Sequence, residues 1–431
     1  MLTSVKRRVA ALLVLVSIPA LQTNATDDND PKLVRWRMQR ILKEVSETVE
    51  KNYYDPKMNG VDWKASTEIA RQRIDNADHT GEMVAAITGL LARLNDSHTV
   101  FIPPGRTEHA LFGFDAKPFG DEVRVYDVMA KGPADLAGLQ VGDRILVVNE
   151  FRATRNNIDI MMRYFRFLNP NHTLQLTISR NGAKDQVLTI EATLQSEFSR
   201  DFSHLYDTYA RERKKEHEPL SKDYDSGILY LRFPSFMTTP HDAGALISKA
   251  KNARAVILDL RENGGGRVET LEEIAGYFFD DRGKLADFIG RDKTVPVEIK
   301  SRSPNIRAAL FVLVDSHSAS ASEMLARYVQ VRHRGKIVGD RTSARVNAAR
   351  VFPGVVGSVY SVFYATEIAV ARAVMADGEG LEGKGVQPDE LCVPTTDDLR
   401  SGKDPCLNRA LELAHGNGSV DKQSSSPSNS K

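Results

Sequence analysis

The sequence of 431 residues has few cysteines and no marked excess of charge of either sign. Its two cysteines are too few for a disulfide framework or a cysteine-rich metal scaffold, so both classes are excluded. The formal net charge of +1 shows no excess of basic residues of the kind that binds nucleic acid or an anionic membrane. With 41% hydrophobic and 27% charged residues, the composition is that of a globular protein, which excludes wholesale disorder, collagen and multi-pass membrane chains.

The first 25 residues predict an export signal. Lys6, Arg7 and Arg8 form a basic start, and residues 9–21 carry no charge. This uncharged run has the length of a signal-peptide core and is too short to span a bilayer. Small residues at 23–25 suit a cleavage site, and an uncleaved anchor is the alternative. Export predicts a secreted or periplasmic protein without an integral membrane span after cleavage.

The two cysteines, Cys392 and Cys406, lie close together in the sequence. In the oxidising compartment that export implies, they could form a disulfide. Closing the loop between them would stabilise the fold by roughly 3 kcal/mol on the chain-entropy model. Two buried free thiols are the alternative.

The length predicts two or three domains at roughly 150 residues each. Apolar residues recur every three or four positions along 33–53 and 85–94, which predicts an N-terminal helical region within 26–110. Short alternating segments and a hairpin signal at 180–182 predict a compact module at 111–195. Apolar strands at 255–260 and 308–314, with a helix after the second, predict an α/β unit within 196–415. The charged start of this unit, 196–222, reads as a linker, and 416–431 as a disordered tail.

A glycine-rich turn follows the first of these buried strands. Gly264, Gly265 and Gly266 come at the carboxyl end of the strand, where open α/β sheets bind ligands. Glycines let the backbone approach a substrate and direct N–H groups at an oxyanion. A phosphate loop competes with this interpretation, although no Lys-Ser/Thr pair follows the turn. A plain turn is the third alternative.

A serine-rich turn follows the second strand. The run Ser318-Ala319-Ser320-Ala321-Ser322 leads from the strand into a predicted helix. A serine on such a turn can present its hydroxyl beside the N–H groups of a helix N-terminus. Alternatively, Ser322 caps the helix. Both can hold, with Ser322 capping and Ser320 reacting, and a reactive serine requires a base.

Seven ordered motifs resemble the carboxy-terminal processing (tail-specific) serine protease family, which includes tricorn core-like proteases. They lie at 94–99, 112–114, 132–143, 227–231, 259–266, 318–323 and 383–389. Each is weakly specific alone, but their joint order covers nearly the whole mature chain. The resemblance implies an α/β (α+β) multidomain fold, in which a ClpP/crotonase-like α/β core carries an inserted PDZ-like β module and an N-terminal helical region. It also implies a serine-type endopeptidase with Ser320 as the nucleophile.

The catalytic base departs from the processing branch of that family, which uses a lysine about 25 residues after the serine. Arg345 occupies this position, and arginine stays protonated and cannot act as a base. The helper glutamine of that branch would fall near Ala349 and is also missing. The tricorn-like branch instead uses a Ser-His pair, matched by Ser97 and His98, and a glutamate near the end of the core.

Glu382 best matches the tricorn-like glutamate, and Glu379 is the fallback. His98 would then take the Ser320 proton while Glu382 orients or stabilises the imidazolium. Each of these residues has a structural alternative: His98 could be structural, Ser97 a turn cap and Glu382 a surface residue. Lys384 ranks low as a substitute base, and Arg261 is expected to form a structural ion pair. His317 is expected to point away from the nucleophile.

The remaining predicted site residues bind substrate or stabilise charge. Ala321 and one of Gly265 or Gly266 are the expected oxyanion donors. Phe112, Gly113 and Phe114 match the family's carboxylate-binding PDZ loop, which implies capture of an apolar protein carboxyl terminus by backbone N–H groups and strand addition. No cofactor, metal or nucleic acid is expected.

The sequence therefore predicts an exported endopeptidase that binds protein or peptide substrates through their carboxyl termini. A catalytically inactive PDZ-containing binding protein is the alternative, because the usual catalytic lysine is absent.

Overall fold

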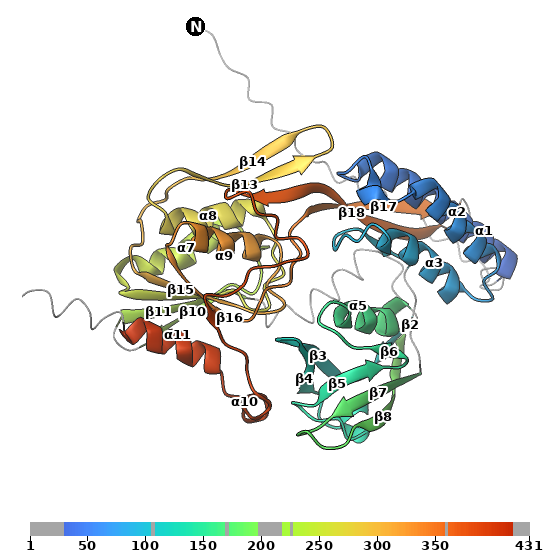
Figure 1. Cartoon of the computed structure of the whole chain (residues 1–431), viewed down its shortest axis with the longest axis horizontal. Coiled ribbons are helices and arrows are strands. Elements are labelled where there is room, and N and C mark those ends of the chain that lie inside the picture. The colour runs from blue at the N-terminus through green and yellow to red at the C-terminus, as the bar shows by residue number, and fades with distance from the viewer. Residues whose placement is uncertain are drawn as a thin grey trace, which may run out of the picture.

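The computed structural model describes residues 30–104, 108–168, 172–196, 218–224, 227–357 and 361–416. Three bodies are visible in Figure 1: a layered core, an arm of strands covered by N-terminal helices, and a smaller β module below the arm. The predicted export signal and nearly all of the predicted tail lie outside the described residues. None of the helices in the described ranges combines the length and apolar content that crossing a bilayer requires.

Three helices form the N-terminal region: α1 (Pro31–Asn52), α2 (Trp63–Asp75) and α3 (Thr80–Ala92). A short 3-10 turn, η1 (Met58–Gly60), joins the first two. Aspartates cap the first two helices, because Asp30 accepts from Lys32 N and Asp62 from Ala65 N, both at 2.9 Å. The predicted apolar stripe is buried, which confirms the helical periodicity of this region.

The helices pack on the arm, a five-stranded antiparallel sheet that the sequence analysis did not foresee. Its central strand, β18 (Val362–Met375), pairs with β1 (Val100–Ile102), β13 (Gly283–Gly290) and β17 (Ala348–Val356), and β13 pairs with β14 (Thr294–Ile299). Since β1 follows the N-terminal helices and β17 and β18 come late in the core, the arm joins distant parts of the chain (Figure 1).

The core is a six-stranded sheet, parallel except at one edge. Its order is β10 (Leu220–Tyr224), β11 (Ile228–Arg232), β12 (Ala255–Asp259), β15 (Ala309–Val314), β16 (Gly335–Gly339) and β19 (Glu390–Leu391), with β10 antiparallel to β11. Helices α7 (Pro240–Ile247), α8 (Val268–Phe278) and α9 (Ala321–Val331) cover one face, and α11 (Pro405–Gly416) covers the other (Figure 1). The 3-10 turn η4 (Ser248–Asn252) follows α7, and α10 (Thr396–Ser401) precedes α11. All five side chains of β12 are buried, as its apolar run predicts.

The smaller module is built from short antiparallel strands. They are β3 (Phe114–Phe119), β4 (Glu122–Val128), β5 (Arg144–Val148), β6 (Phe151–Arg152), β7 (Thr173–Ser179) and β8 (Gln186–Glu191). The strands β2 (Glu108–Leu111) and β9 (Thr193–Ser196) form a separate antiparallel pair. Two helices, α4 (Pro133–Leu136) and α5 (Ile158–Arg163), complete it, and α5 runs into a π-helical turn, η2 (Tyr164–Leu168).

Cys392 and Cys406 form a disulfide with Cα atoms 5.5 Å apart. The bond ties the segment after β19 to the start of α11 and brackets α10. Of the two alternatives left open by the sequence, the structure therefore has the bonded one.

Candidate active site

The turn that bears Ser320, the predicted nucleophile, lies between β15 and α9, at the carboxyl end of the core sheet. Ser320 is the N-cap of α9 and has a φ of +56° and a ψ of −120°. A positive φ is strained for a residue with a side chain and persists only where its surroundings enforce it. Here the Ser320 N–H donates to Arg345 O at 2.6 Å and to Glu323 Oε2 at 3.1 Å. The hydroxyl of Ser320 is therefore held at the N-terminus of a helix.

The capping role predicted for Ser322 is wrong. Ser322 lies one position inside α9, and its hydroxyl donates to Asn263 O at 2.8 Å. The helix begins earlier than expected because Glu323 accepts the Ser320 N–H from the third helical position, which is half of a capping box.

The glycine turn after β12 packs directly against Ser320. A Cβ on Gly265 would lie 2.7 Å from Ser320 Cβ, and one on Gly266 would lie 2.5 Å from the backbone carbon of Phe236. Only glycine fits this contact, so the turn does more than reverse the chain. The Gly265 N–H donates to Asn263 Oδ1 at 2.8 Å. Among the described residues, the N–H groups of Gly266 and Ala321 have no hydrogen-bond acceptor.

Gly265→Ala is expected to lower kcat by about 100-fold, because displacing reacting groups by about 1 Å has an effect of this size. The added methyl group would displace Ser320, and the φ of +93° at Gly265 adds strain. Gly264→Ala is the matched control, since its Cβ would meet nothing within 4 Å. Steady-state kinetics on a peptide substrate measures both variants, and equal activity in the two would contradict the contact.

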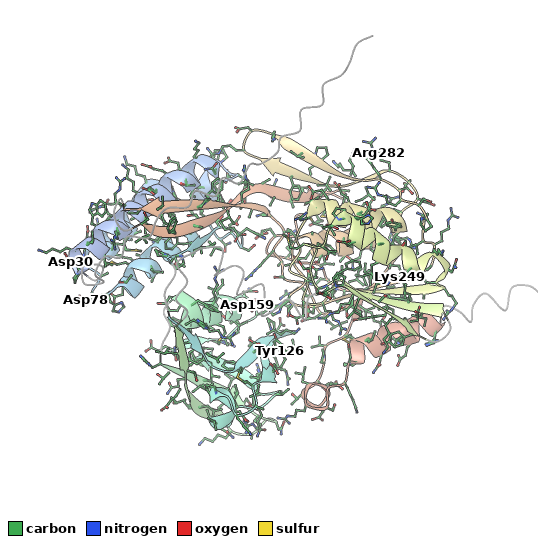
Figure 2. All side chains as sticks on the ribbon, turned by 180° about the vertical axis from the view of Figure 1, so that it is seen from behind. Asp30, Asp78, Tyr126, Asp159, Lys249 and Arg282 are labelled. Atoms are coloured by element: carbon green, nitrogen blue, oxygen red, sulfur yellow. A yellow bond between two sulfur atoms is a disulfide. The ribbon has the colours of Figure 1, made fainter. Side chains whose placement is uncertain are left out.

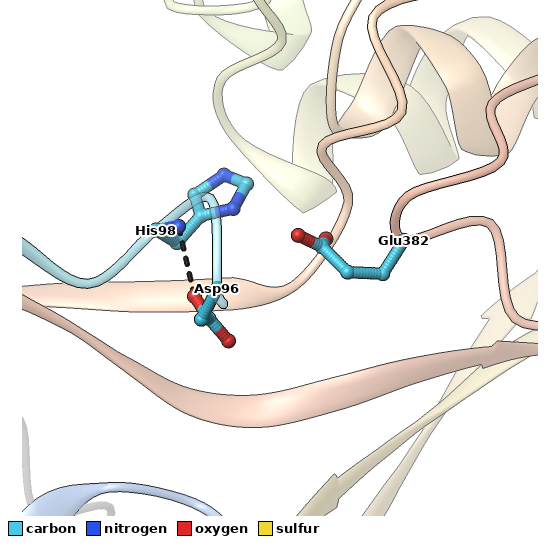
Figure 3. Close-up of side chains that lie close together, drawn as sticks. All are labelled: Asp96, His98 and Glu382. Atoms are coloured by element: carbon cyan, nitrogen blue, oxygen red, sulfur yellow. Dashed lines mark hydrogen bonds between the residues drawn. The ribbon is translucent and has the colours of Figure 1, made fainter. Parts of the chain in front are cut away.

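The Ser97-His98 pair lies on a tight turn between α3 and β1. The Asp96 carboxylate shapes this turn by accepting the His98 N–H at 2.8 Å. Ser97 Oγ lies 2.9 Å from His98 Nδ1, and the Ser97 N–H donates to Glu382 Oε1 at 3.2 Å. Figure 3 shows Asp96 and His98 on one turn and the carboxylate of Glu382 pointing toward that turn.

Asp96, His98 and Glu382 each offer a ligand atom within 4.8 Å of the others, so this group could hold a metal ion. All four carboxylate oxygens, however, already accept hydrogen bonds. Asp96 Oδ2 accepts from Asn347 Nδ2 and Tyr53, and Glu382 Oε2 from the N–H groups of Val346 and Asn347. Burial, reinforced by Glu382, raises the pKa of Asp96. The carboxyl groups of Asp96 and Glu382 thus both lie close to the His98 imidazole.

One short segment, residues 345–347, connects the turn that bears Ser320 to the cluster of Asp96, His98 and Glu382. Arg345 O accepts the Ser320 N–H, while Val346 N–H donates to Glu382 at 2.9 Å. Asn347 reaches Asp96 through its side chain at 3.2 Å. The structure thus brings Ser320, Ser97, His98 and Glu382 to one region. Within the described ranges, no hydrogen bond joins Ser320 to His98 directly. In enzymes without substrate, the hydrogen bond between nucleophile and base is often long, and it shortens when substrate binds.

Glu323 has a role at this turn that its sequence context does not reveal by itself, although its spacing from Ser320 fits the capping-box pattern. Glu323 is fully buried and accepts hydrogen bonds from Ser320 N, Thr342 Oγ1, Ala344 N at 2.8 Å and Arg345 N at 2.9 Å. Burial raises the pKa of Glu323 to about 7, and these donors oppose the shift by favouring the carboxylate. Glu323 therefore joins the nucleophile turn to the segment that leads to Glu382.

Several neighbouring charged residues lie outside this cluster. Glu379, the fallback carboxylate, forms an exposed ion pair with Lys384 at 3.0 Å. Arg261 forms the expected structural ion pairs, with Asp259 at 2.6 Å and with Asp404 at 2.8 Å. His317 is hydrogen-bonded to Glu262 at 2.9 Å.

The predicted carboxylate-binding loop, Phe112 to Phe114, connects β2 to β3 beside α5. The side chains of Phe112 and Phe114 are buried, and Gly113 turns the chain with a φ of +72°. The carbonyls of Phe112 and Gly113 accept backbone N–H groups at 2.9 Å, which fixes the course of the loop.

Models of three known domain families match the chain. Peptidase family S41 matches residues 227–392, the PDZ domain 110–191 and the tricorn protease C1 domain 37–92. The crystal structure of mature CPAF resembles this fold with a TM-score of 0.67 at 15% identity, covering 90% of this chain and 99% of that one. The photosystem II D1 C-terminal processing protease has a TM-score of 0.50 at 20% identity, covering 83% of this chain and 93% of that one. At these identities, the likeness shows the fold.

Several curated proteins with similar sequences are named as carboxyl-terminal-processing or CtpA-like proteases. Carboxyl-terminal-processing peptidase 1 of Arabidopsis thaliana is 24% identical over 88% of this chain and 76% of its own length. The carboxyl-terminal-processing protease of a Picosynechococcus species is 25% identical over 88% of this chain and 87% of its own. A probable CtpA-like serine protease of Staphylococcus epidermidis is 25% identical over 71% of this chain, which spans 59% of that relative. The chain therefore carries a peptidase family S41 domain over residues 227–392 and a PDZ domain over 110–191, and it is similar to carboxyl-terminal-processing (tail-specific) serine-type endopeptidases.

Proposed function

We propose that the chain cleaves peptide bonds through an acyl-enzyme on Ser320, with His98 as the base. His98 Nε2 accepts the proton of Ser320 Oγ as the oxygen attacks the peptide carbonyl, and it returns that proton to the leaving amine. A water molecule, deprotonated by His98, then releases the acyl group and regenerates the serine. The observation that carries this proposal is the hydrogen-bonded segment 345–347, which joins the Ser320 turn to Glu382 and Asp96.

The surrounding groups support the charges that this reaction creates. Ser97 Oγ is bonded to His98 Nδ1, which leaves Nε2 for the serine, while Glu382 and Asp96 stabilise the imidazolium. The N–H groups of Gly266 and Ala321 bind the oxyanion, since the Gly265 N–H is already bonded to Asn263. Arg345 stays protonated and takes no part in proton transfer.

The substrate side of the proposal rests on the PDZ domain. We propose that Phe112, Gly113 and Phe114 receive the carboxyl terminus of a protein substrate and that the upstream peptide adds to the edge of β3. The disulfide suits the oxidising compartment that the predicted export signal implies. Export to the periplasm or the medium is part of this proposal.

The test is covalent labelling with a fluorophosphonate, which reacts with activated serines. Wild-type protein is expected to be labelled at Ser320, and Ser320→Ala to remain unlabelled, with peptide mapping as the measurement. Failure to label the folded wild-type protein would contradict the proposal and favour the inactive binding protein that the Arg345 position suggests. Labelling at another serine would reject Ser320 alone.

A further inference from the structure

The PDZ domain contributes a charged side chain to the loops of the proposed active site. Lys117 on β3 donates to Asp315 Oδ2 at 2.8 Å and also to Glu262 Oε1. Its side chain is only 11% exposed, and its ammonium group lies 5.1 Å from the ring centre of Tyr126 and 5.4 Å from that of Phe119. Figure 2 shows Tyr126 and Asp159 on the side of the module that faces the core. A lysine this buried is retained only where its charge is compensated.

Its two partners lie on the two loops that hold the proposed catalytic groups. Glu262 precedes the glycine turn by two positions and has a φ of +62°. Asp315 is the first residue after β15, five positions before Ser320. A change in the position of either carboxylate would therefore move an oxyanion donor or the nucleophile.

Asp315 also bonds the two loops to each other. Its Oδ1 accepts the N–H of Glu262 at 3.0 Å and those of His317 and Ser318 at 3.1 Å. Burial disfavours the charge of Asp315 and would raise its pKa. Lys117 and the neighbouring cations favour the carboxylate more strongly, so the pKa of Asp315 is lowered. Without Lys117, two close carboxylates would repel each other where the loops meet.

The contacts extend to a second residue of the PDZ domain. His317 lies between the two parts, with Nδ1 2.9 Å from Glu262 Oε2 and Nε2 3.4 Å from Asp159 Oδ1. Lys117 and Asp159 belong to the PDZ domain, while His317, Glu262 and Asp315 belong to the core loops. The interface beside the nucleophile is thus a continuous chain of polar contacts.

We propose that Lys117 is a positioning residue for catalysis, which the PDZ domain supplies to clamp the glycine turn and the nucleophile loop together. The proposal rests on the function proposed above for Ser320. The PDZ domain itself remains docked without this clamp, because Arg155 pairs with Asp340 at 2.9 Å and Arg400 of α10 donates to Val141 O at 3.0 Å and to Asn181 at 2.8 Å. Loss of Lys117 is therefore expected to disturb catalysis more than domain docking.

The test compares Lys117→Met with Arg400→Met, which removes an interface cation whose hydrogen bonds, among the described residues, go to Val141 and Asn181 of the PDZ domain. Lys117→Met is expected to lower kcat and the rate of fluorophosphonate labelling by about tenfold or more with little change in KM, as small displacements of reacting groups do. Arg400→Met is expected to stay within about twofold of wild type. Equal losses in both variants, or none in Lys117→Met, would overturn the proposal.

Hydrogen exchange gives a readout that does not depend on activity. The amides of Glu262, His317 and Ser318 are expected to exchange faster in Lys117→Met, because their common acceptor, Asp315, loses its counter-ion. Unchanged exchange at these amides would reject the clamp even if the wild-type protein proved inactive. If the wild-type protein were inactive but these amides exchanged faster in Lys117→Met, the contacts of Lys117 would stand and only the function proposed for Ser320 would be rejected.

A second variant separates the clamp from general destabilisation. Adding Glu262→Gln to Lys117→Met removes one of the two repelling carboxylates and is expected to restore several-fold of the lost labelling rate. Additive losses in the double variant would contradict the clamp. If Lys117→Met does not fold, Lys117→Gln, which keeps a hydrogen-bond donor but removes the charge, tests the same point, since Asp315 again loses its counter-ion and exchange at Ser318 is expected to accelerate.

Discussion

Replacing His98 by alanine is expected to reduce kcat by about 10⁴- to 10⁶-fold, the range seen when the base of a serine protease is removed. The loss follows because His98 is the proposed base, and Arg345, at the position of the processing branch's lysine, cannot accept a proton. KM for a peptide substrate is expected to change little. Steady-state kinetics, with active-site titration to count competent serines, measures the effect.

The matched control is Arg345→Lys, which restores the residue type of the processing branch. It is not expected to raise activity in the wild-type background, nor to rescue His98→Ala. Full turnover by His98→Ala would show that the base has been misassigned. If His98→Ala with Arg345→Lys were active while His98→Ala alone was not, a lysine at position 345 could act as the base in this fold.

Replacing Glu323 by alanine is expected to lower the free energy of unfolding by about 3–5 kcal/mol, since each buried donor left unpaired costs about 1–3 kcal/mol. The N–H groups of Ala344 and Arg345 and the Thr342 hydroxyl would lose their acceptor, whereas the Ser320 N–H would keep Arg345 O. Chemical denaturation measures the loss. Glu323→Gln, which keeps the volume but turns an NH₂ group toward these donors, is expected to fall between alanine and wild type. A wild-type stability for Glu323→Ala would contradict this account.

The same residue predicts a pH dependence with a definite sign. Burial raises the pKa of Glu323 to about 7 in the folded chain from an ordinary value of 4.5. Between these values, the folded state retains a proton that the unfolded state has lost. Stability therefore falls as pH rises through this window, by up to about 1.4 kcal/mol per pH unit. Glu323→Gln is expected to lack this component, and an unchanged pH profile would argue against it.

The sequence was informative where the chemistry follows local patterns. The strand before Gly265 and the turn bearing Ser320 could both be predicted, because parallel strands end at the same edge of a sheet. Glu382 could be chosen over Glu379 only by resemblance, and the structure places Glu382 alone of the two beside His98. Their catalytic roles remain predictions.

Other features depend on contacts between residues far apart in the chain. Asn347 reaches Asp96 across 251 positions, and Lys117 reaches Asp315 across 198. Neither residue stands in a motif, since an isolated lysine or asparagine has the same local sequence whether it is buried or exposed. The arm was missed for a related reason: β1 is only three residues long and pairs with β18 from the distant end of the core. The sequence points to the wrong N-cap because Ser318, Ser320 and Ser322 have the same propensity to cap a helix, and only the structure shows that Ser320 does so.

The loop closed by Cys392 and Cys406 has a consequence for how the PDZ domain is held. This loop carries α10, whose Arg400 contacts the PDZ domain, and a Cβ on Gly142 would lie only 2.7 Å from Thr396. A free segment would lose conformational entropy each time it settled on its partner, whereas a cross-linked one has lost most of it beforehand. The disulfide between Cys392 and Cys406 therefore preorganises α10 for its contact with the PDZ domain. In a reducing compartment, the same hydrogen bonds would hold the PDZ domain less tightly.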